Sequence, residues 1–404
     1  LIELSNTIFK PLENHLQGEQ LFICPDNALT LIPFDILPLN AENNQLLIDK
    51  YNITYLTAAR DLLRYQYNPN RPASESLVIA DPNFDLSVDI SPNIPNNDNS
   101  SKSKIYIQEE GLSINLDSLA TEIIESLDNL HDYRFSPVPE IAEIAKVAAS
   151  QFNVQALLQN QALKSYLTNG KCPEILVLAT HGFFLTQKSV PKNLLETQEF
   201  GERGLRRSQQ MQITENPLFR SGFALAGANT WLLGGEIPPE AGEGIVFAQD
   251  VAGFDLWANK IILLIACQTA VGDVTAGEGV KGLRSAFTAA GARLLIMSLW
   301  SVPVKPSILL MNRFFANMDN RKLPAQIALK EAQNYIRTMT RNELESLAIG
   351  KEILQELQLK IAPVLQRNPE LANTWKISEY PLQHPYFWGA WVCVGRELKE
   401  EENQ

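Results

Sequence analysis

A histidine and a cysteine stand at matching places in two segments of similar design. KCPEILVLATHGFF over residues 171–184 is an apolar run that ends near His181, and KIILLIACQ over 260–268 is an apolar run that ends at Cys267. A thiolate is a strong nucleophile, and an imidazole near neutral pH can take the proton of a thiol. The two segments therefore predict nucleophilic chemistry by a Cys/His pair, provided that the two strands lie side by side.

The elements that must position this pair are buried strands. Neither apolar run alternates with polar residues, which is typical of parallel strands that are covered on both faces. A glycine-rich loop follows Cys267, and then an amphipathic helix with Gly291 as its expected end. A lone cysteine is more often inert core. It is the repeated design, at strand ends where α/β sheets bind ligands, that favours a functional site.

Strands and helices alternate along much of the chain. This order predicts an α/β fold with a mostly parallel central sheet flanked by helices. Two further expectations are a hairpin over 221–233 that turns at Ala228-Asn229, and one charged helix over 341–366. The buried strands are predicted at residues 76–80, 154–158, 175–179, 261–266 and 294–299.

The chain is expected to divide near residue 70. Residues 1–70 form a first unit with no obvious chemistry, and residues 71–404 form the unit that holds the Cys/His pair. Two stretches, about 85–135 and 187–216, are polar and interrupt the second unit. Their composition predicts two mobile insertions.

Composition excludes several classes of function. The 404 residues carry a net charge of -12 with a pI near 5.0 and no basic stripe, which argues against nucleic acid as a partner. The four cysteines form no CxxC pair and the four histidines do not cluster, so we expect no metal or other cofactor. The apolar runs are too short to span a bilayer, so no membrane partner is expected. No signal peptide is visible, which favours the cytoplasm, and Leu1 in place of Met suggests a fragment of a longer chain.

The glycine-rich loop also matches two nucleotide-binding patterns in part. Gly277, Gly279 and Gly282 spell GxGxxG, but about ten residues separate them from the strand where the dinucleotide fingerprint needs a tight turn. Glu278 would repel a pyrophosphate, and it stands where a P-loop needs lysine. Both nucleotide interpretations are therefore disfavoured, and the absence of GxSxG makes a serine hydrolase of that type improbable.

Several longer motifs resemble one family. The chain is similar to CHAT domains, which are caspase- and separase-like cysteine peptidase modules usually found beside tetratricopeptide repeats. The resemblance covers nearly the whole chain apart from the two polar insertions, but residues 302–306 (VPVKP) depart from the acidic stretch that is common in the family. The matching segments are PDNALTLIPFDILP at 25–38, ATHGFF at 179–184, NPLFRSGFALAGAN at 216–229, GEGIVFAQDVAGFDLW at 242–257, ACQTAVGDVTAGEGVKGLRSAFTAAGA at 266–292 and HPYFWGAWVCVG at 384–395.

This resemblance implies a caspase-like fold and cleavage of a polypeptide substrate. The catalytic histidine of the family falls on His181 and its nucleophile on Cys267. The backbone N–H groups of Gly182 and Cys267 would then form the oxyanion hole. A tetratricopeptide-repeat region or a partner protein is the expected regulator. The alternative is a latent scaffold that keeps the Cys/His pair but only binds partner proteins.

Substrate preference rests on the carboxylates near strand ends. Caspase-like enzymes that cut after basic residues place an acid at the end of the first sheet strand, which here is Asp81. The other interpretation is that Asp81 merely ends a strand, and Asp26 and Asp250 are the fallback candidates. We expect cleavage after Arg or Lys. The exposed arginines of the stretch 187–216 also suggest self-cleavage there, against the interpretation of a tolerated surface insertion.

Overall fold

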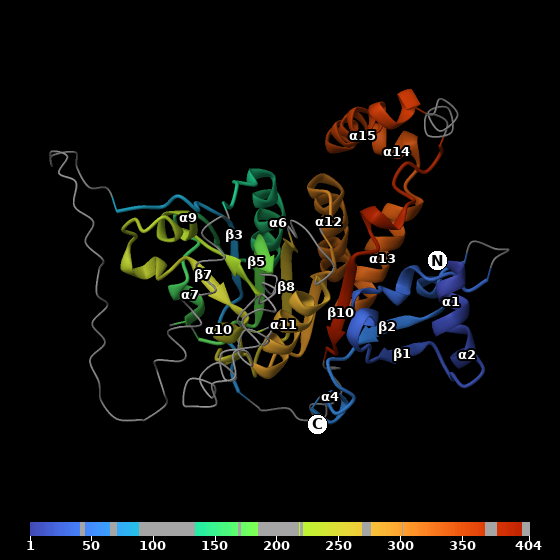
Figure 1. Ribbon diagram of the computed structural model, residues 1–404, viewed down its shortest axis with the longest axis horizontal. Helices are drawn as coiled ribbons and strands as arrows, with labels where there is room; N and C mark the ends of the chain where they lie inside the picture. The colour runs from blue at the N-terminus through green and yellow to red at the C-terminus, as the bar shows by residue number, and fades with distance from the viewer. Residues whose placement is uncertain are drawn as a thin grey trace, which may run out of the picture.

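The fold was obtained as a computed structural model. It describes residues 1–40, 45–64, 71–88, 134–168, 171–184, 218, 221–268, 276–300, 302–367 and 378–397. In these residues the strands form one sheet in the order β1-β2-β10-β9-β8-β5-β3-β4, and β6 and β7 extend it from the end of β5 (Figure 1). The strands are β1 Gln20–Ile23, β2 Asn52–Tyr55, β3 Leu77–Pro82, β4 Ala156–Gln159, β5 Ile175–Phe184, β6 Ser221–Ala224, β7 Ile245–Phe247, β8 Ile261–Gln268, β9 Leu294–Ser298 and β10 Trp391–Gly395.

The sheet is mixed, and its direction changes once along the main path. β9, β8, β5, β3 and β4 pair in parallel, as expected from the alternation of strands and helices. β10 is antiparallel to β9, and β2 and β1 continue in the direction of β10. The carboxyl ends of β3, β5 and β8 therefore share one edge of the sheet, and the carboxyl ends of β1 and β2 lie at the opposite edge.

Helices cover both faces of this sheet, which agrees with the predicted α/β class. In β5 the side chains of Val177 and Ala179 pack in one cluster with α6 and α12, and those of Leu176 and Leu178 pack in the other with α11. Figure 1 shows α6 beside α12, and α10 beside α11. The longer helices are α6 Ala142–Phe152, α11 Ala276–Ala289, α12 Val304–Asn320, α13 Ala325–Thr338 and α15 Ala348–Arg367.

The remaining helices are short, with seven residues or fewer. The blue N-terminal elements lie beside β2 and β10 in Figure 1, so the strands of residues 1–70 join the same sheet as the rest. The division near residue 70 stays a prediction. These helices are α1 Ile2–Ile8, α2 Lys10–Glu13, η1 Asn27–Leu31, η2 Phe34–Ile36, α3 Leu47–Lys50, α4 Asp61–Arg64, η3 Pro139–Ile141, α7 Ser165–Thr168, α9 Ala228–Leu232, η6 Pro239–Ala241, α10 Ala248–Ala252, α14 Arg341–Ser346 and η7 Pro385–Phe387.

Two local predictions were wrong. The expected hairpin over 221–233 is a strand followed by a helix, because β6 pairs with β5 and β7 and Gly227, with φ +88°, turns the chain into α9. The expected helix over 341–366 is two helices, because Leu347 between α14 and α15 has an extended backbone. Most of both polar insertions lies outside the described residues. Within the described part of the chain, no helix is long and apolar enough to cross a membrane.

Candidate active site

His181 and Cys267 are register partners in two neighbouring parallel strands. The pairing of β5 with β8 runs from Ile175 opposite Ile261 to Gly182 opposite Gln268, and it sets the Cα of His181 opposite the Cα of Cys267. Directly paired positions of adjacent strands are close neighbours in any sheet. The backbone thus brings the two predicted positions together at the carboxyl edge of the sheet, while the thiol itself lies outside the described part of the structure.

The imidazole of His181 is partly exposed and is held by a backbone carbonyl. Its Nε2 lies 2.7 Å from the carbonyl oxygen of Ser136. A carbonyl oxygen can only accept a hydrogen bond, so Nε2 carries the proton and donates a hydrogen bond to the Ser136 carbonyl. In the neutral ring this leaves Nδ1 as the nitrogen with a free lone pair. The histidine is therefore held in the tautomer that offers Nδ1 as a base.

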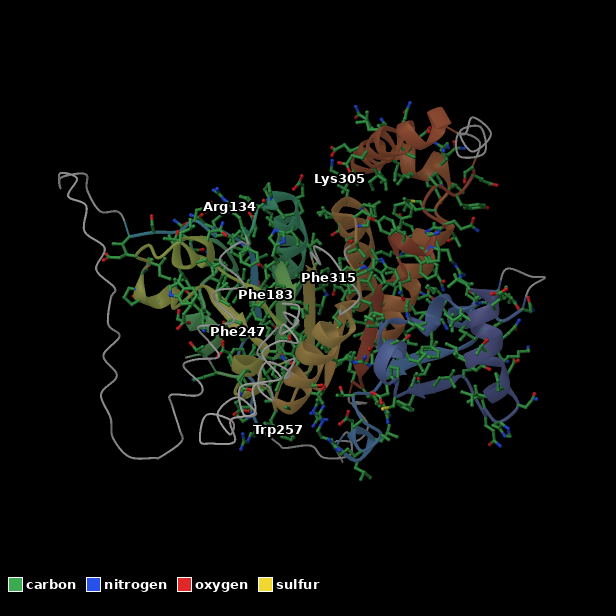
Figure 2. All side chains as sticks on the ribbon, in the orientation of Figure 1. Arg134, Phe183, Phe247, Trp257, Lys305 and Phe315 are labelled. Atoms are coloured by element: carbon green, nitrogen blue, oxygen red, sulfur yellow. The ribbon has the colours of Figure 1, made fainter. Side chains whose placement is uncertain are left out.

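Aromatic rings flank the same imidazole. The ring centroids of Phe84 and Phe135 lie 5.5 and 6.1 Å from that of His181, and 5.6 Å from one another. Phe135 also contacts Phe183, whose ring meets Phe247 edge-on at 5.7 Å. Figure 2 labels Phe183, on β5, and Phe247, on β7. Burial of these rings fixes the plane of the imidazole and keeps water from one side of it.

Gly182 follows the histidine and packs between the two neighbouring strands. A Cβ at this position would lie 3.4 Å from the Cβ of Ala266, 3.5 Å from its carbonyl oxygen and 3.7 Å from that of Gly222. Residue 182 pairs with Gln268 on one side and with Phe223 on the other. The three distances are ordinary van der Waals contacts, so a Cβ would fit here between β6 and β8 beside His181.

Asp81 lies at the same edge of the sheet, next to the end of β3. A register shift between Ala80 and Pro82 leaves it between paired residues, with φ +44°, which is uncommon outside glycine. The side chain of Gln159 donates to Oδ2 and to the carbonyl oxygen of Asp81. Oδ1 is buried and has no hydrogen-bond partner among the described residues. Burial, with a smaller contribution from Glu140, raises the pKa of this carboxyl, which is 6% exposed.

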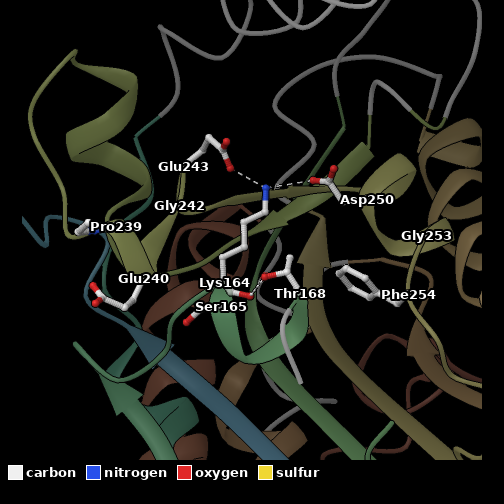
Figure 3. Close-up of a pocket in the computed structure, with 10 residues that line it drawn as sticks. All are labelled: Lys164, Ser165, Thr168, Pro239, Glu240, Gly242, Glu243, Asp250, Gly253 and Phe254. Carbon is white, nitrogen blue, oxygen red and sulfur yellow. Dashed lines mark hydrogen bonds and ion pairs between the residues drawn. The ribbon is translucent and has the colours of Figure 1, made fainter. Parts of the chain in front are cut away.

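The structure does not bring Asp250 to the histidine. Asp250 lies on α10, whose buried residues pack against the face of the sheet opposite to that of Val177 and Ala179. One Oδ2 accepts from the backbone N–H of Phe247 at 3.0 Å and lies 3.3 Å from the Nζ of Lys164. In Figure 3 the Nζ of Lys164 lies between the carboxylates of Asp250 and Glu243. These three residues line an open hollow of about 640 Å³.

Asp26 is still farther away. It follows β1, and β2, β10 and β9 lie between β1 and β8. Because β1 runs against β8, the end of β1 lies at the opposite edge of the sheet. Asp26 is exposed there, near η1. Of the three candidate carboxylates, Asp81 alone ends a strand at the edge that holds His181.

Two residues of this site had not been predicted from the sequence. Ser136 acts through its carbonyl oxygen, which every residue type has, so no side-chain pattern could single it out. Asn229 is buried and binds Phe135, the residue before Ser136. Its sequence signal was the asparagine in ALAGAN, which was assigned to a turn.

Comparisons with known proteins agree with this architecture. Residues 1–396 match the sequence profile of the CHAT domain. Tetratricopeptide repeat protein 28 of Homo sapiens is 36% identical over 100 residues, and the same protein of Mus musculus is 34% identical over 100 residues. Each match spans 25% of this chain and 4% of the relative. CHAT domains are related to caspase-like peptidases. Since the profile covers almost the whole sequence, the chain belongs to the CHAT domain family.

Proposed function

We propose that this protein is a cysteine endopeptidase that hydrolyses peptide bonds of a polypeptide substrate with Cys267 and His181. The observation that carries the proposal is the direct register pairing of these two positions at the carboxyl edge of the sheet. The tautomer of His181 supports it, because the bond from Nε2 to Ser136 leaves Nδ1 free to act as a base.

The chemistry follows acyl transfer. The thiol proton passes to Nδ1 of His181, and the thiolate attacks the carbonyl carbon of the scissile bond. The backbone N–H groups of Gly182 and Cys267 stabilise the oxyanion, and removal of one such donor typically costs about 2.7–4 kcal/mol in the barrier. The imidazolium then gives its proton to the leaving amine. The C–N bond breaks, and the acyl group stays on Cys267 as a thioester. Water, deprotonated by His181, attacks the thioester and releases the new carboxylate and the free thiol.

The substrate side chain before the cleaved bond is a basic one, and Asp81 binds it. Two observations support this assignment. Asp81 belongs to the strand next to β5 and lies at the edge where His181 lies, and its buried Oδ1 has no partner among the described residues. A buried carboxylate without a cation is unfavourable, which agrees with the direction of its pKa. An arginine or lysine side chain would supply the missing donor and the opposite charge.

A panel of fluorogenic peptides tests the proposal. Peptides that differ only in the residue before the reporter, Arg, Lys, Asp, Met or Leu, should be cleaved after Arg and Lys alone. The Cys267→Ala variant is the matched control and should cleave none. Turnover only after Asp or Met would reject the basic preference, and equal turnover by Cys267→Ala would reject the proposed nucleophile.

The latent scaffold remains the alternative, and a second experiment separates it from the peptidase. A peptide-like electrophile should label Cys267 in the wild type and label it much more slowly in His181→Ala. An inert thiol in both proteins would favour the scaffold. The matched relatives are tetratricopeptide repeat proteins by name, which supports a repeat region or partner protein as the regulator. Residues 187–216 lie outside the described part of the chain, so self-cleavage there stays a prediction.

A further inference from the structure

We propose that Asn229 is a positioning residue for His181, acting through the backbone of residues 84, 135 and 136. This inference deepens the proposed function and rests on it for its catalytic meaning. Asn229 is the second residue of α9 and is 2% exposed. Its side-chain amide bonds to Asp85 and Phe135 within the protein.

The carboxamide of Asn229 holds Phe135 as a neighbouring strand would. Its Oδ1 accepts from the backbone N–H of Phe135 at 2.9 Å, and its Nδ2 donates to the carbonyl oxygen of Phe135 at 2.9 Å. The second hydrogen of Nδ2 points to Oδ1 of Asp85 at 3.0 Å. Both donors and one acceptor of the amide are thus occupied. The next carbonyl along the chain is that of Ser136, which accepts a hydrogen bond from Nε2 of His181.

The same residue also holds the other side of the imidazole. The backbone N–H of Asn229 donates to the carbonyl oxygen of Phe84 at 2.8 Å. The rings of Phe84 and Phe135 both pack against His181. Three described contacts of the imidazole therefore depend on Asn229. The rings belong to Phe84 and Phe135, which Asn229 bonds, and the carbonyl belongs to Ser136, which directly follows Phe135. A single buried amide links the segments before and after the first insertion to the histidine.

The chemistry of the site requires an amide and excludes its isostere. An aspartate at position 229 would keep the size but lose both donors. Its charge would face the carboxylate of Asp85 and the carbonyl of Phe135, and buried like-charged or unpaired oxygens are strongly unfavourable. The segment 135–136 would shift, and the carbonyl of Ser136 would no longer hold the Nε2–H tautomer of His181. A shift of about 1 Å in such a group can cost about 100-fold in rate.

The test compares Asn229→Asp with a matched control, Asn259→Asp. Asn259 is also fully buried, and its Nδ2 donates to the carbonyls of Pro173 and Glu174, at the amino end of β5. The first readout is the ¹⁵N spectrum of histidine-labelled full-length protein at a pH where the ring is neutral, with the His181 signals assigned from His181→Ala. We expect a pure Nε2–H tautomer in the wild type and in Asn259→Asp, and a mixture of tautomers in Asn229→Asp.

Peptide turnover is the second readout. Asn229→Asp should lower kcat by about 100-fold with KM unchanged, and Asn259→Asp should leave both unchanged. An unaltered His181 spectrum in a folded Asn229→Asp protein, or an equal change in Asn259→Asp, would overturn the proposal. If Asn229→Asp does not fold, Asp85→Ala replaces it: a second tautomer supports the proposal, and an unaltered spectrum refutes it. Expected spectra in a wild type that cleaves no peptide would refute the peptidase and leave the positioning role intact.

Discussion

Polar side chains differ in exposure and in hydrogen-bond partners between the two ends of the main sheet. At the carboxyl edge of β3, β5 and β8, His181 is partly exposed, and Asp81 has a left-handed backbone and an Oδ1 with no partner in the described part of the chain. At the other end, where β10, β2 and β1 run in the opposite direction, the buried side chains of Tyr55, Asp35 and Gln333 have hydrogen-bond partners within the protein.

We call the region of β10, β2 and β1 the closed end and the carboxyl edge of β3, β5 and β8 the open end. Two small hydrogen-bond networks illustrate the closed end. The hydroxyl of Tyr55 accepts from the backbone N–H of Phe34 at 2.6 Å and donates to Oδ2 of Asp35 at 2.8 Å. Nε2 of Gln333, on α13, donates to the carbonyls of Trp388 and Trp391 at 3.1 and 3.0 Å. These groups are buried and face no solvent. Such satisfied networks stabilise a core, whereas a buried carboxylate oxygen without a partner among the described residues retains capacity for a ligand.

This difference predicts separate effects on activity and on stability. Replacement of His181 by alanine should lower peptide turnover by about 10⁴-fold, since the base and acid of both half-reactions are lost. Its thermal unfolding should change little, because the ring is partly exposed. Steady-state assays with an Arg peptide and a calorimetric scan measure the two effects. Turnover within tenfold of the wild type would break the assignment of the base.

The opposite effect is expected at the closed end. Trp391 on β10 is 1% exposed and packs among α13 and α12. Trp391→Ala should lower the free energy of unfolding by about 3–5 kcal/mol, because the cavity cannot be refilled. Denaturant titration measures the loss. Under conditions where the variant stays folded, its KM for peptides should equal that of the wild type. A change in substrate preference would show that the two ends are coupled.

The buried acid of the closed end predicts a dependence of stability on pH. Burial raises the pKa of Asp35 from 3.8 to about 6, against the hydrogen bond from Tyr55. A raised pKa in the folded state means that this stabilising contribution is present below pH 3.8 and is lost as the pH rises to about 6. The loss amounts to about 3 kcal/mol for this group.

The experiment measures the difference in free energy of unfolding between the wild type and Asp35→Asn across this interval. The difference should move by about 3 kcal/mol in favour of the variant as the pH rises. Glu343→Gln is a control of opposite sign, because hydrogen bonds from Thr340 lower the pKa of Glu343. A difference that does not vary with pH would contradict the burial argument for Asp35.

The open end should respond to a loss of charge through specificity. Asp81→Asn keeps the size, and asparagine tolerates the left-handed backbone at this position. Loss of a charged partner for the substrate cation should cost about 2–3 kcal/mol in kcat/KM for Arg and Lys peptides, or about 100-fold. Peptides with neutral residues serve as the control and should not slow. An unchanged preference for basic residues would remove Asp81 from the substrate site.

Some parts of this arrangement were predictable from the sequence, and others were not. Buried apolar runs that end in His181 and Cys267 predicted adjacent strands, because a parallel sheet collects its carboxyl ends at one edge. The direction of β10 was not predictable, since Trp391 to Val394 would be equally apolar in either orientation. That direction decides where Asp26 lies.

Contacts through the backbone were the harder part. The carbonyl of Ser136 reaches His181 across 45 residues of sequence, and nothing in a serine before a proline indicates this bond. Asn229 was predicted to form a turn, because asparagine near glycine and alanine is common in turns. Its hydrogen-bond partner Phe135 is 94 residues away in sequence, and only the folded chain brings the two together. Local patterns predicted His181 and Cys267 as the candidate pair, and tertiary packing supplied the groups that contact His181.

The smallest effect is expected at Asp250, the carboxylate that the fold keeps apart from both ends. Asp250→Ala removes the acceptor for the N–H of Phe247 at the start of α10 and one partner of Lys164, which keeps Glu243 at 2.6 Å. Loss of this capping bond should lower the free energy of unfolding by about 1 kcal/mol. Glu243→Ala, which removes the other carboxylate and no cap, should cost less. The preference for basic peptides should persist in both variants. If Asp250→Ala lost that preference, Asp250 would have to contact the substrate. Substrate binding would then not be confined to the carboxyl edge that holds His181 and Asp81.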